Sequence, residues 1–385
     1  MPSDDLPRFI QLHLLTSYPP ANLNRDDLGR PKTAVMGGAQ RLRVSSQCLK
    51  RHWRTSDLFE EALGDHMGVR TKEMGLRVYR RLKKRGVGEE DAKDWAREIA
   101  GEFGDRENKD NDDPLKHLEL KQLAHFSPQE QRDIRDLADT LAEEERGPEN
   151  DELELLRRDH KAVDIAMFGR MMADDTEYSV EGAVQVAHAL TVHQADIEED
   201  YFSGVDDLND GFFSAVDRIN GQTIEDSENG SVEREDEGAA HLGEKEFGAG
   251  LFYQYICVDR DLLVDNLEGD DDLAERAIRA LAEAAATVAP SGMQNSYGSR
   301  ACANYILAEK GDQQPRSLSV AYLNPVSETG YLDQAIRRLE ETAEQMDHAY
   351  GDCADDRELM NVPDMEGTLD DVLGFVAPEA EVVTQ

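Results

Sequence analysis

The chain has 385 residues, of which 39% are hydrophobic, so it can bury a substantial core and is not expected to be disordered. Acidic residues outnumber basic ones by 82 to 42, which gives a formal net charge of −40 and indicates a strongly hydrated surface. The four cysteines are far apart, which argues against a disulfide framework or a zinc finger. Because no apolar run approaches the ~20 residues of a membrane span, we expect a cytoplasmic protein that contacts no membrane.

The first expected elements are two strands. Residues 8–16 alternate apolar and polar side chains, which predicts a strand with one buried face. Residues 40–44 alternate in the same way, so a second strand should carry Arg41 and Arg43 on the face away from the core. This strand leads directly into a helix, and both arginines could therefore converge with the start of that helix on an anion.

The helix expected at 45–54 divides into an apolar and a basic face. Ser45 is a natural N-cap, while Cys48, Leu49 and Trp53 face the core. The N–H groups of a first helical turn attract anions, and a basic stripe beside them would favour phosphates. A basic helical face can also be no more than a solvated surface. The stripe consists of Gln47, Lys50, Arg51 and Arg54.

The loop at 22–38, "NLNRDDLGRPKTAVMGG", precedes this strand and helix. Between residues 25 and 54 eight basic residues accompany only two acidic ones, which favours a polyanion site in so acidic a chain. The two acids, Asp26 and Asp27, could hold Mg²⁺ or act as acid and base, or could simply pair with nearby arginines. The chain contains no phosphate-binding glycine motif, nucleophile elbow or metalloprotease motif.

The remaining pattern predicts an α+β fold. Helical segments rich in acidic and basic residues fill about residues 60–160. The last of them begins with Ser127 as N-cap and Pro128 at the first helical position. Strands are expected at 249–258 and 301–310. Further helices are expected at 179–194, 272–288 and 332–346.

An acidic segment at 196–240 has the composition of an exposed loop. It contains a short repeat, "YFSGVDDLND" from Tyr201 and "FFSAVDRING" from Phe212. Two aromatic pairs in a solvated loop predict a surface that stacks on a ligand, although one copy could instead anchor the loop on the domain.

Several segments, in this order along the chain, resemble the CasC (Cse-type) backbone subunit of the type I-E CRISPR surveillance complex, Cascade. Together they span most of the sequence. The segments are "LNRDDLGRPKTAVMGGAQRLRVSSQCLKR" at 23–51, "VDIAMFGRM" at 163–171, "GAVQVAHALTVHQ" at 182–194, "DYFSGVDDL" at 200–208, "AHLGEKEFGAGLFYQY" at 240–255 and "APSGMQNSY" at 289–297.

The resemblance implies an α+β protein with an RRM-like (ferredoxin-like) palm, a helical fingers insertion and a thumb-like loop. Copies are expected to stack along one guide RNA as a filament. The implied parts are the palm at 1–59, the fingers at 60–177, a palm helix at 178–195, the acidic thumb loop at 196–246 and the rest of the palm at 247–385.

The resemblance also implies roles for individual residues. The loop and the following helix would hold guide phosphates, the thumb would displace a base at regular intervals, and Met171 would wedge near that base. Whether the aromatic pair at Tyr201 or the pair at Phe212 and Phe213 forms the wedge is open. The expected RNA-binding residues are Arg25, Lys32, Arg43, Ser45, Ser46, Gln47, Lys50, Arg51, Arg54, Met171, Tyr201, Phe202 and Ser203.

The function implied is antiviral defence without catalysis. The protein would hold the guide by its backbone and leave the base edges free to pair with any target. No catalytic residue, metal or cofactor is expected. The expected partners are crRNA, the target DNA strand paired to it, other copies of the chain, and the large, small, guide-cap and guide-processing endonuclease subunits. The alternative is a Mg²⁺-dependent endoribonuclease that uses Asp26 or Asp27, as in related type III backbone proteins.

Overall fold

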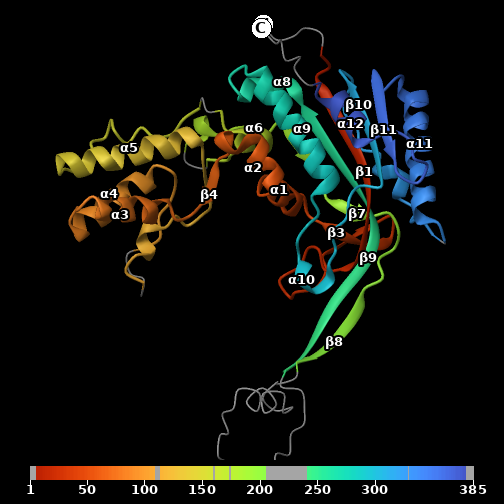
Figure 1. Cartoon of the computed structure of the whole chain (residues 1–385), viewed down its shortest axis with the longest axis horizontal. Helices are drawn as coiled ribbons and strands as arrows, with labels where there is room; N and C mark the ends of the chain where they lie inside the picture. The colour runs from red at the N-terminus through yellow and green to blue at the C-terminus, as the bar shows by residue number, and fades with distance from the viewer. Residues whose placement is uncertain are drawn as a thin grey trace, which may run out of the picture.

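The computed structural model describes residues 6–108, 113–158, 161–172, 175–204, 241–327 and 329–378. A large antiparallel sheet lies at the centre, in the strand order β11-β10-β1-β9-β7-β3-β2, and β6 and β8 also pair with β9 (Figure 1). Helices cover both faces, so the predicted α+β class is confirmed. The strands of this sheet are β1 (Phe9–Ala21), β2 (Thr33–Met36), β3 (Ala39–Val44), β6 (Val184–Val186), β7 (Ala189–Thr191), β8 (Glu198–Gly204), β9 (His241–Asp259), β10 (Tyr305–Gly311) and β11 (Asp356–Asn361).

β1 is a central strand that is buried on both faces. It pairs with β9 on one side and β10 on the other. The prediction of one buried face is therefore wrong, because Gln11 and His13 lie beneath a second helical layer. The His13 ring is bonded to the Tyr253 hydroxyl at 2.9 Å and to the Glu309 carboxylate at 3.1 Å. These partners offset the cost of burying polar groups in the sheet.

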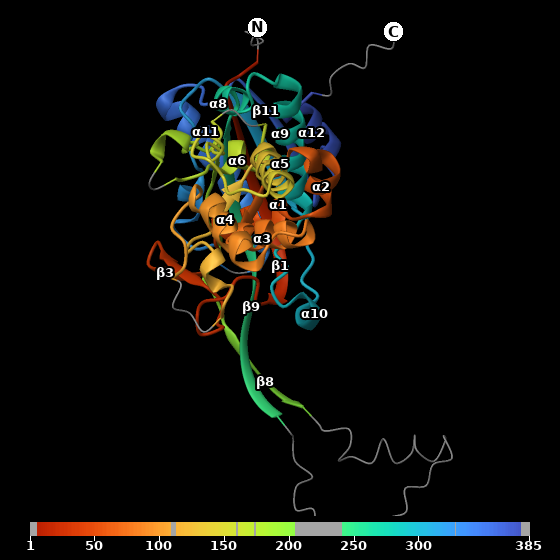
Figure 2. The same ribbon diagram turned by 90° about the vertical axis from the view of Figure 1, so that its left-hand side faces the viewer.

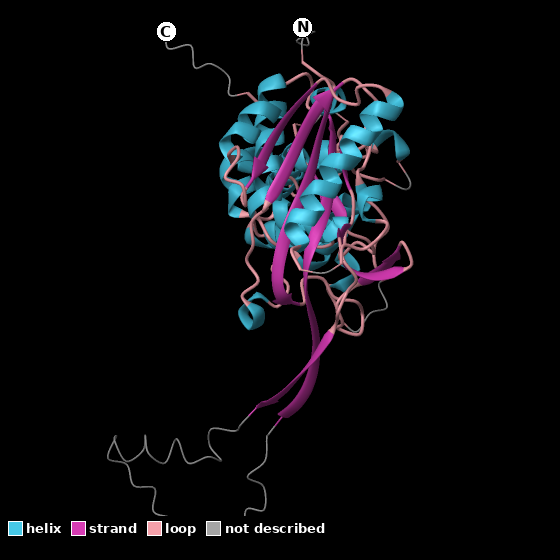
Figure 3. Ribbon diagram, turned by 90° about the vertical axis from the view of Figure 1, so that its right-hand side faces the viewer, coloured by secondary structure: helices cyan, strands magenta, loops and turns pink. Residues whose placement is uncertain are grey.

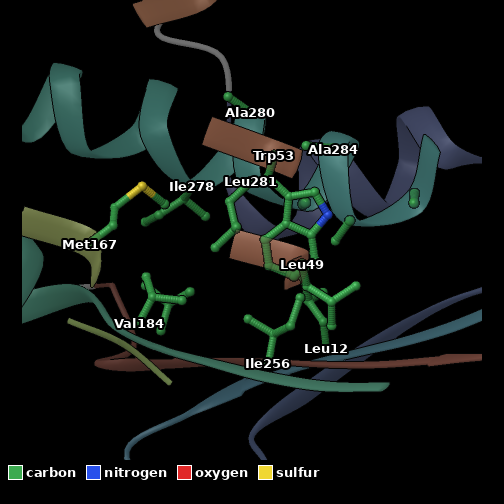
Figure 4. Packing of buried hydrophobic residues seen from close by; sticks show 14 of the residues in the cluster. Leu12, Leu49, Trp53, Met167, Val184, Ile256, Ile278, Ala280, Leu281 and Ala284 are labelled. Atoms are coloured by element: carbon green, nitrogen blue, oxygen red, sulfur yellow. The ribbon is translucent and has the colours of Figure 1, made fainter. Parts of the chain in front are cut away.

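One face of the sheet packs under four helices. Trp53 and Leu49 from α1 lie against Leu12 and Ile256 of the strands, with α9 beside them (Figure 4). α9 buries a row of alanines, whose small side chains let its backbone approach the neighbouring elements closely. The helices of this layer are α1 (Ser46–Arg54), α2 (Asp57–Leu63), α9 (Asp271–Thr287) and α12 (Leu369–Val376), while α6 (Val163–Phe168), α8 (Arg260–Asn266) and α10 (Gln294–Tyr297) lie around it.

The opposite face packs under α11 (Tyr331–Tyr350) and the short 3₁₀ segment Ser319–Tyr322 (Figure 3). Tyr253 and Tyr305 of the strands are buried in this layer with Leu339 of α11. The sheet therefore has no open face over its centre. Among the described residues no helix combines the length and apolar character needed to cross a membrane.

The prediction of a helix at 179–194 is wrong. The segment forms β6 and β7 instead, which both pair with β9. β-branched residues such as Val184 and Thr191 favour strands, and the long β9 supplies backbone hydrogen-bond partners for both of them. His188 lies between the two strands, where it contacts the start of α1.

A separate lobe, termed the α3–α5 lobe, extends from the sheet domain and has its own core. Its longest helix begins as predicted, because the Ser127 hydroxyl caps the N–H of Glu130 while the Glu130 carboxylate accepts the N–H of Ser127. The elements of the lobe are β4 (Val69–Thr71), α3 (Met74–Lys84), α4 (Glu89–Gly101), β5 (Ala124–Phe126) and α5 (Pro128–Glu144).

The acidic segment is not a loop throughout. β8 pairs with the first part of β9, from Glu198 opposite Phe247 to Gly204 opposite His241. The two strands form a ribbon that projects away from the sheet domain (Figure 2). Phe212 and Phe213 lie outside the described residues.

Candidate functional site

α1 forms the centre of the candidate site, as the sequence predicts. The Ser45 hydroxyl accepts the N–H of Cys48 at 3.3 Å and caps the helix. Leu49 and Trp53 are buried in the core (Figure 4), which fixes the orientation of the helix about its axis. Gln47 and Arg51 are exposed on the opposite side.

Two side chains hold the first turn of α1 in place. The N–H of Ser45 donates to Oδ1 of Asn24 at 2.9 Å, and the N–H of Ser46 donates to Nδ1 of His188 at 2.9 Å. Partial burial, followed by the charges of Arg43 and Lys32, lowers the pKa of His188. The ring is therefore neutral at neutral pH, which leaves Nδ1 free to accept.

Basic residues from the loop and the strand lie beside the start of α1, and Arg51 follows in the last turn of the helix. The N–H of Arg43 in β3 donates to the carbonyl of Lys32 at 2.8 Å, so Lys32, the residue directly before β2, lies next to Arg43. Burial raises the pKa of the Cys48 thiol, while the charges of Lys32 and Arg51 oppose the rise. Lys32 and Arg43 lie beside the start of α1, Arg51 lies in its last turn, and we call these three residues the α1 cluster.

The loop before β2 is closed by Asp26. Its Oδ1 accepts the N–H groups of Leu28 at 3.0 Å and Arg30 at 2.9 Å. The N–H of Arg30, above all, lowers the pKa of Asp26, and the Arg30 side chain pairs with its other oxygen at 3.4 Å. Asp27 and Arg25 are exposed. Asp26 therefore shapes the turn, whereas Arg25 is presented to solvent.

Two residues of the predicted stripe have partners inside the protein. Nζ of Lys50 lies 3.4 Å from the carbonyl of Val184 and over the Phe168 ring, and burial lowers the pKa of Lys50. Arg54 pairs with Asp164 at 3.2 Å. The stripe predicted from the sequence is thus only partly open to a ligand.

The expectation that Arg41 faces a ligand is wrong. Its side chain is fully buried, and it donates to the carbonyls of Thr191 at 3.0 Å and Tyr322 at 2.8 Å. β3 pairs with β7 on one side and with β2 on the other, and the Arg41 side chain reaches both β7 and the segment around Tyr322, which the alternation of β3 alone could not reveal. Arg41 therefore ties β3 to these two segments.

Asp164 joins α1 to the α3–α5 lobe, and sequence reasoning missed it. Its carboxylate is fully buried and is bonded to Nε2 of His125 at 2.7 Å, the N–H of Gly68 at 2.8 Å and Arg54. Burial would raise the pKa of Asp164, but the bond from His125 and the other positive partners outweigh burial and lower it. One carboxylate thus connects α6 and α1 to β5 and to the residue directly before β4, at the base of the lobe.

We expect Asp164→Asn to destabilise the protein at neutral pH and to change how stability depends on pH. Because the folded pKa lies below the unfolded value of about 3.9, the contribution of the carboxylate is complete above that value and is lost as pH falls through the folded pKa. Urea denaturation between pH 3 and pH 7 measures both effects. The exposed Asp352→Asn is the control, and an identical pH profile for Asp164→Asn and wild type would contradict the expectation.

Met171 stands on the surface next to a buried anchor. Its side chain is 87% exposed, whereas its neighbour Arg170 is buried and bonded to both oxygens of Glu130 at 2.8 and 2.9 Å. Arg170 also pairs through its backbone with Val180. The Arg170 anchor therefore holds Met171 in an exposed position.

The ribbon carries the first aromatic pair of the repeat. Tyr201 lies on β8 opposite Glu244 and is 62% exposed. The backbones of Phe202 and Ser203 continue the same strand, while their side chains are outside the described set. Nothing in the described residues brings Tyr201 to the α1 cluster within one chain.

Two acidic residues of the loop line a hollow near the site. A shallow hollow beside the loop is lined by Asp26, Asp27, Arg25 and Gly292, among others. Within the described ranges no three His, Cys, Asp or Glu side chains are arranged to hold a metal ion. Asp26 and Asp27 therefore form a pair without a third ligand in this part of the chain.

Comparison with known proteins places this geometry in a family. The model of the CT1975-like protein family matches residues 10–220 and 211–372. No curated protein matched the sequence. A solved chain described as "CRISPR RNA-guided surveillance complex, pre-nicking" is 27% identical with a TM-score of 0.78, and the match covers 97% of this chain and 100% of that one. A second, described as "CRISPR RNA-guided surveillance complex", is 24% identical with a TM-score of 0.68, covering 96% and 99%.

Proposed function

The chain belongs to the CT1975-like protein family, and from that membership and the α1 cluster we propose that it is a non-catalytic, guide-RNA-binding backbone subunit of a type I-E CRISPR Cascade complex. The match to a surveillance-complex chain over nearly the full length of both supports a role in such a complex. On this proposal the protein acts in the cytoplasm.

The observation that carries the proposal is the α1 cluster. Lys32 and Arg43 lie beside a capped helix start, Arg51 is exposed in the last turn of the same helix, and Arg25 and Gln47 are also exposed. Arginine and lysine bind phosphates without reading bases, which is what a guide needs if its base edges are to stay free. In a chain whose net charge is −40, a group of basic residues on one surface favours a binding site for a polyanion.

The order of the central strands supports the RRM-like palm. In a ferredoxin-like βαββαβ unit the fourth strand lies beside the first, and the first lies beside the third. Here β10 and β9 flank β1, β6 and β7 lie beyond β9, and α1 and α9 pack on the same face. RRM domains usually bind RNA on the open sheet face, but α11 covers that face here, so the guide would lie along loop and helix instead.

Filament formation and base displacement belong to the same proposal. The α3–α5 lobe would serve as the fingers and the ribbon as the thumb, which would reach over a neighbouring copy. Exposed Met171 and Tyr201 are suited to wedge against a base. The partners would be crRNA, the paired target DNA strand, further copies of the chain and the other Cascade subunits.

Co-expression of the chain with a CRISPR array and the other subunits tests the proposal. The purified complex should contain RNA of one defined length, as expected for a filament on a processed guide. Nucleic acid of random length, or none, would contradict it. A nucleic-acid mimic with an acidic surface, the weakest alternative, requires that no RNA co-purifies.

A ribonuclease is the second candidate, because Asp26 and Asp27 line one hollow. Asp26 is occupied in closing its loop, and we expect no cleavage when the assembled complex is mixed with complementary RNA and Mg²⁺. Gel analysis with and without a chelator measures this. Mg²⁺-dependent products that disappear in Asp27→Asn would establish the ribonuclease instead.

A further inference from the structure

Asn22 is a buried amide that links two segments with different expected tasks. The residue is 1% exposed, and its Nδ2 donates to the carbonyl of Gly29 at 3.0 Å and to that of Glu246 at 3.0 Å. Carbonyl oxygens only accept, so the nitrogen of the amide must face them. Both hydrogens of one amide group are thereby used to hold two separate stretches of backbone together.

The two stretches are the guide-holding loop and the base of the ribbon. Gly29 lies in the turn closed by Asp26, in the loop that also supplies Asn24 to the N–H of Ser45. Glu246 lies on β9 opposite Glu199 of β8, where the ribbon begins. The Asn22 amide thus spans the short distance from the α1 site to the ribbon.

Packing at the same place leaves the two stretches little freedom. A Cβ on Gly292 would lie 2.5 Å from the carbonyl of Leu23, so the segment before α10 is tight against the loop. The ring centroids of Phe247 and Tyr297 are 5.8 Å apart, which joins α10 itself to the base of the ribbon. Figures 1 and 2 both show α10 beside the base of β8 and β9. Loop, ribbon base and α10 therefore form one packed unit.

We propose that Asn22 is a positioning residue that couples guide binding at the loop to the order of the ribbon. The proposal rests on the proposed function, in which the loop contacts guide phosphates and the ribbon acts on a guide base. Guide bound at Arg25 and the α1 cluster restrains the Gly29 turn, and the amide passes this restraint to Glu246. Coupling is reciprocal, so a ribbon fixed by a neighbouring copy also strengthens the hold of the loop on the guide.

Amide hydrogen exchange of the full chain in its purified ribonucleoprotein tests the coupling. In the wild type, digestion of the guide with ribonuclease should speed exchange of residues 198–204 about tenfold, which lies within the range of about 5- to 150-fold that is typical of coupling between two sites. In Asn22→Ala the ribbon should exchange fast from the start and should not respond to digestion. The pairing of β1 with β10 should stay protected in both, which shows that the sheet is intact.

Asn266→Ala is the matched control. Nδ2 of Asn266 also bridges two backbone carbonyls, those of Ala166 at 3.1 Å and Glu181 at 2.8 Å, away from the ribbon. This variant should keep the response of the ribbon to digestion. Asn22→Ser, whose hydroxyl has a single proton to donate, should give an intermediate response and replaces Asn22→Ala if that variant does not fold.

The outcomes separate the coupling from the function. If digestion of the guide speeds exchange of the ribbon in Asn22→Ala as much as in the wild type, the proposed coupling is wrong. A complex purified without RNA contradicts the proposed function instead, and the RNA-free variants then decide the role of the amide alone. In that case, equal exchange of residues 198–204 in Asn22→Ala and Asn266→Ala overturns the role of Asn22.

Discussion

Replacing Lys50 and Arg51 by glutamate should lower the guide RNA bound per protein at least about tenfold, the effect of removing one or more charge-assisted hydrogen bonds to phosphate. Arg51 is exposed in the last turn of α1, and Nζ of Lys50, one residue before it, lies 3.4 Å from the carbonyl of Val184. Two acids at these positions would repel phosphates from the basic face of α1. Quantifying RNA in the purified complex measures the reduction.

The salt dependence of RNA binding gives a second reading of the same variant. For single strands the slope of log affinity against log salt becomes shallower by about 0.7 for each phosphate that the protein no longer neutralises. Arg337→Glu with Arg338→Glu is the matched control, since these residues are also adjacent on a helix but lie on α11. Unchanged occupancy in the α1 variant, or an equal reduction in the control, would refute the role of the basic face of α1.

Trp53→Ala should lower the free energy of unfolding by about 3–5 kcal/mol, the usual cost of deleting a fully buried aromatic side chain. Trp53 is 1% exposed and packs in the main core with Leu49 and the helix α9 (Figure 4). The cavity would lie directly under α1, so RNA occupancy should fall together with stability. Urea denaturation followed by circular dichroism measures the change in stability.

Trp95→Ala provides the control for this variant. Trp95 lies on α4 and is only partly buried at the edge of the separate core of the α3–α5 lobe. Trp95→Ala should lower the free energy of unfolding by less than Trp53→Ala does, and guide RNA should still bind at α1. A reduction of bound RNA in Trp95→Ala equal to that in Trp53→Ala would mean that general destabilisation, rather than the seating of α1, controls binding.

Local signals in the sequence were sufficient for the helix at the site. The Ser45 cap and the spacing of Leu49 and Trp53 depend on residues close in the chain, and the structure contains that helix as expected. The capping box at Ser127 and Glu130 is local in the same way. Such features are readable because their geometry is set within a few residues.

Features set by distant partners were not readable. The segment 179–194 has helical periodicity, yet pairing with β9 makes it two strands. Arg41 and Arg43 lie two residues apart on one strand, which predicts a common role. The Arg41 side chain is instead buried and bonded to the carbonyls of Thr191 and Tyr322. Tertiary contacts of this kind override local propensity and change which charges remain available.

The polar connections around the site also depend on distant residues. Arg54 has the spacing of a phosphate ligand, but Asp164, 110 positions away, occupies it. Asn22 reaches Glu246, which is 224 positions away, and nothing in its immediate sequence indicates that contact. Sequence spacing identified the basic segment, whereas only the fold shows which of its members have internal partners.

Ultraviolet crosslinking of the purified ribonucleoprotein, followed by mass spectrometry of the peptides, tests the central claim most directly. If guide phosphates lie on the α1 site, nucleotides should crosslink to peptides that contain residues 23–32 and 43–54. Tyr201 on the ribbon should form a second crosslinked group. Crosslinks confined to other parts of the chain, with none at the loop or at α1, would contradict the account.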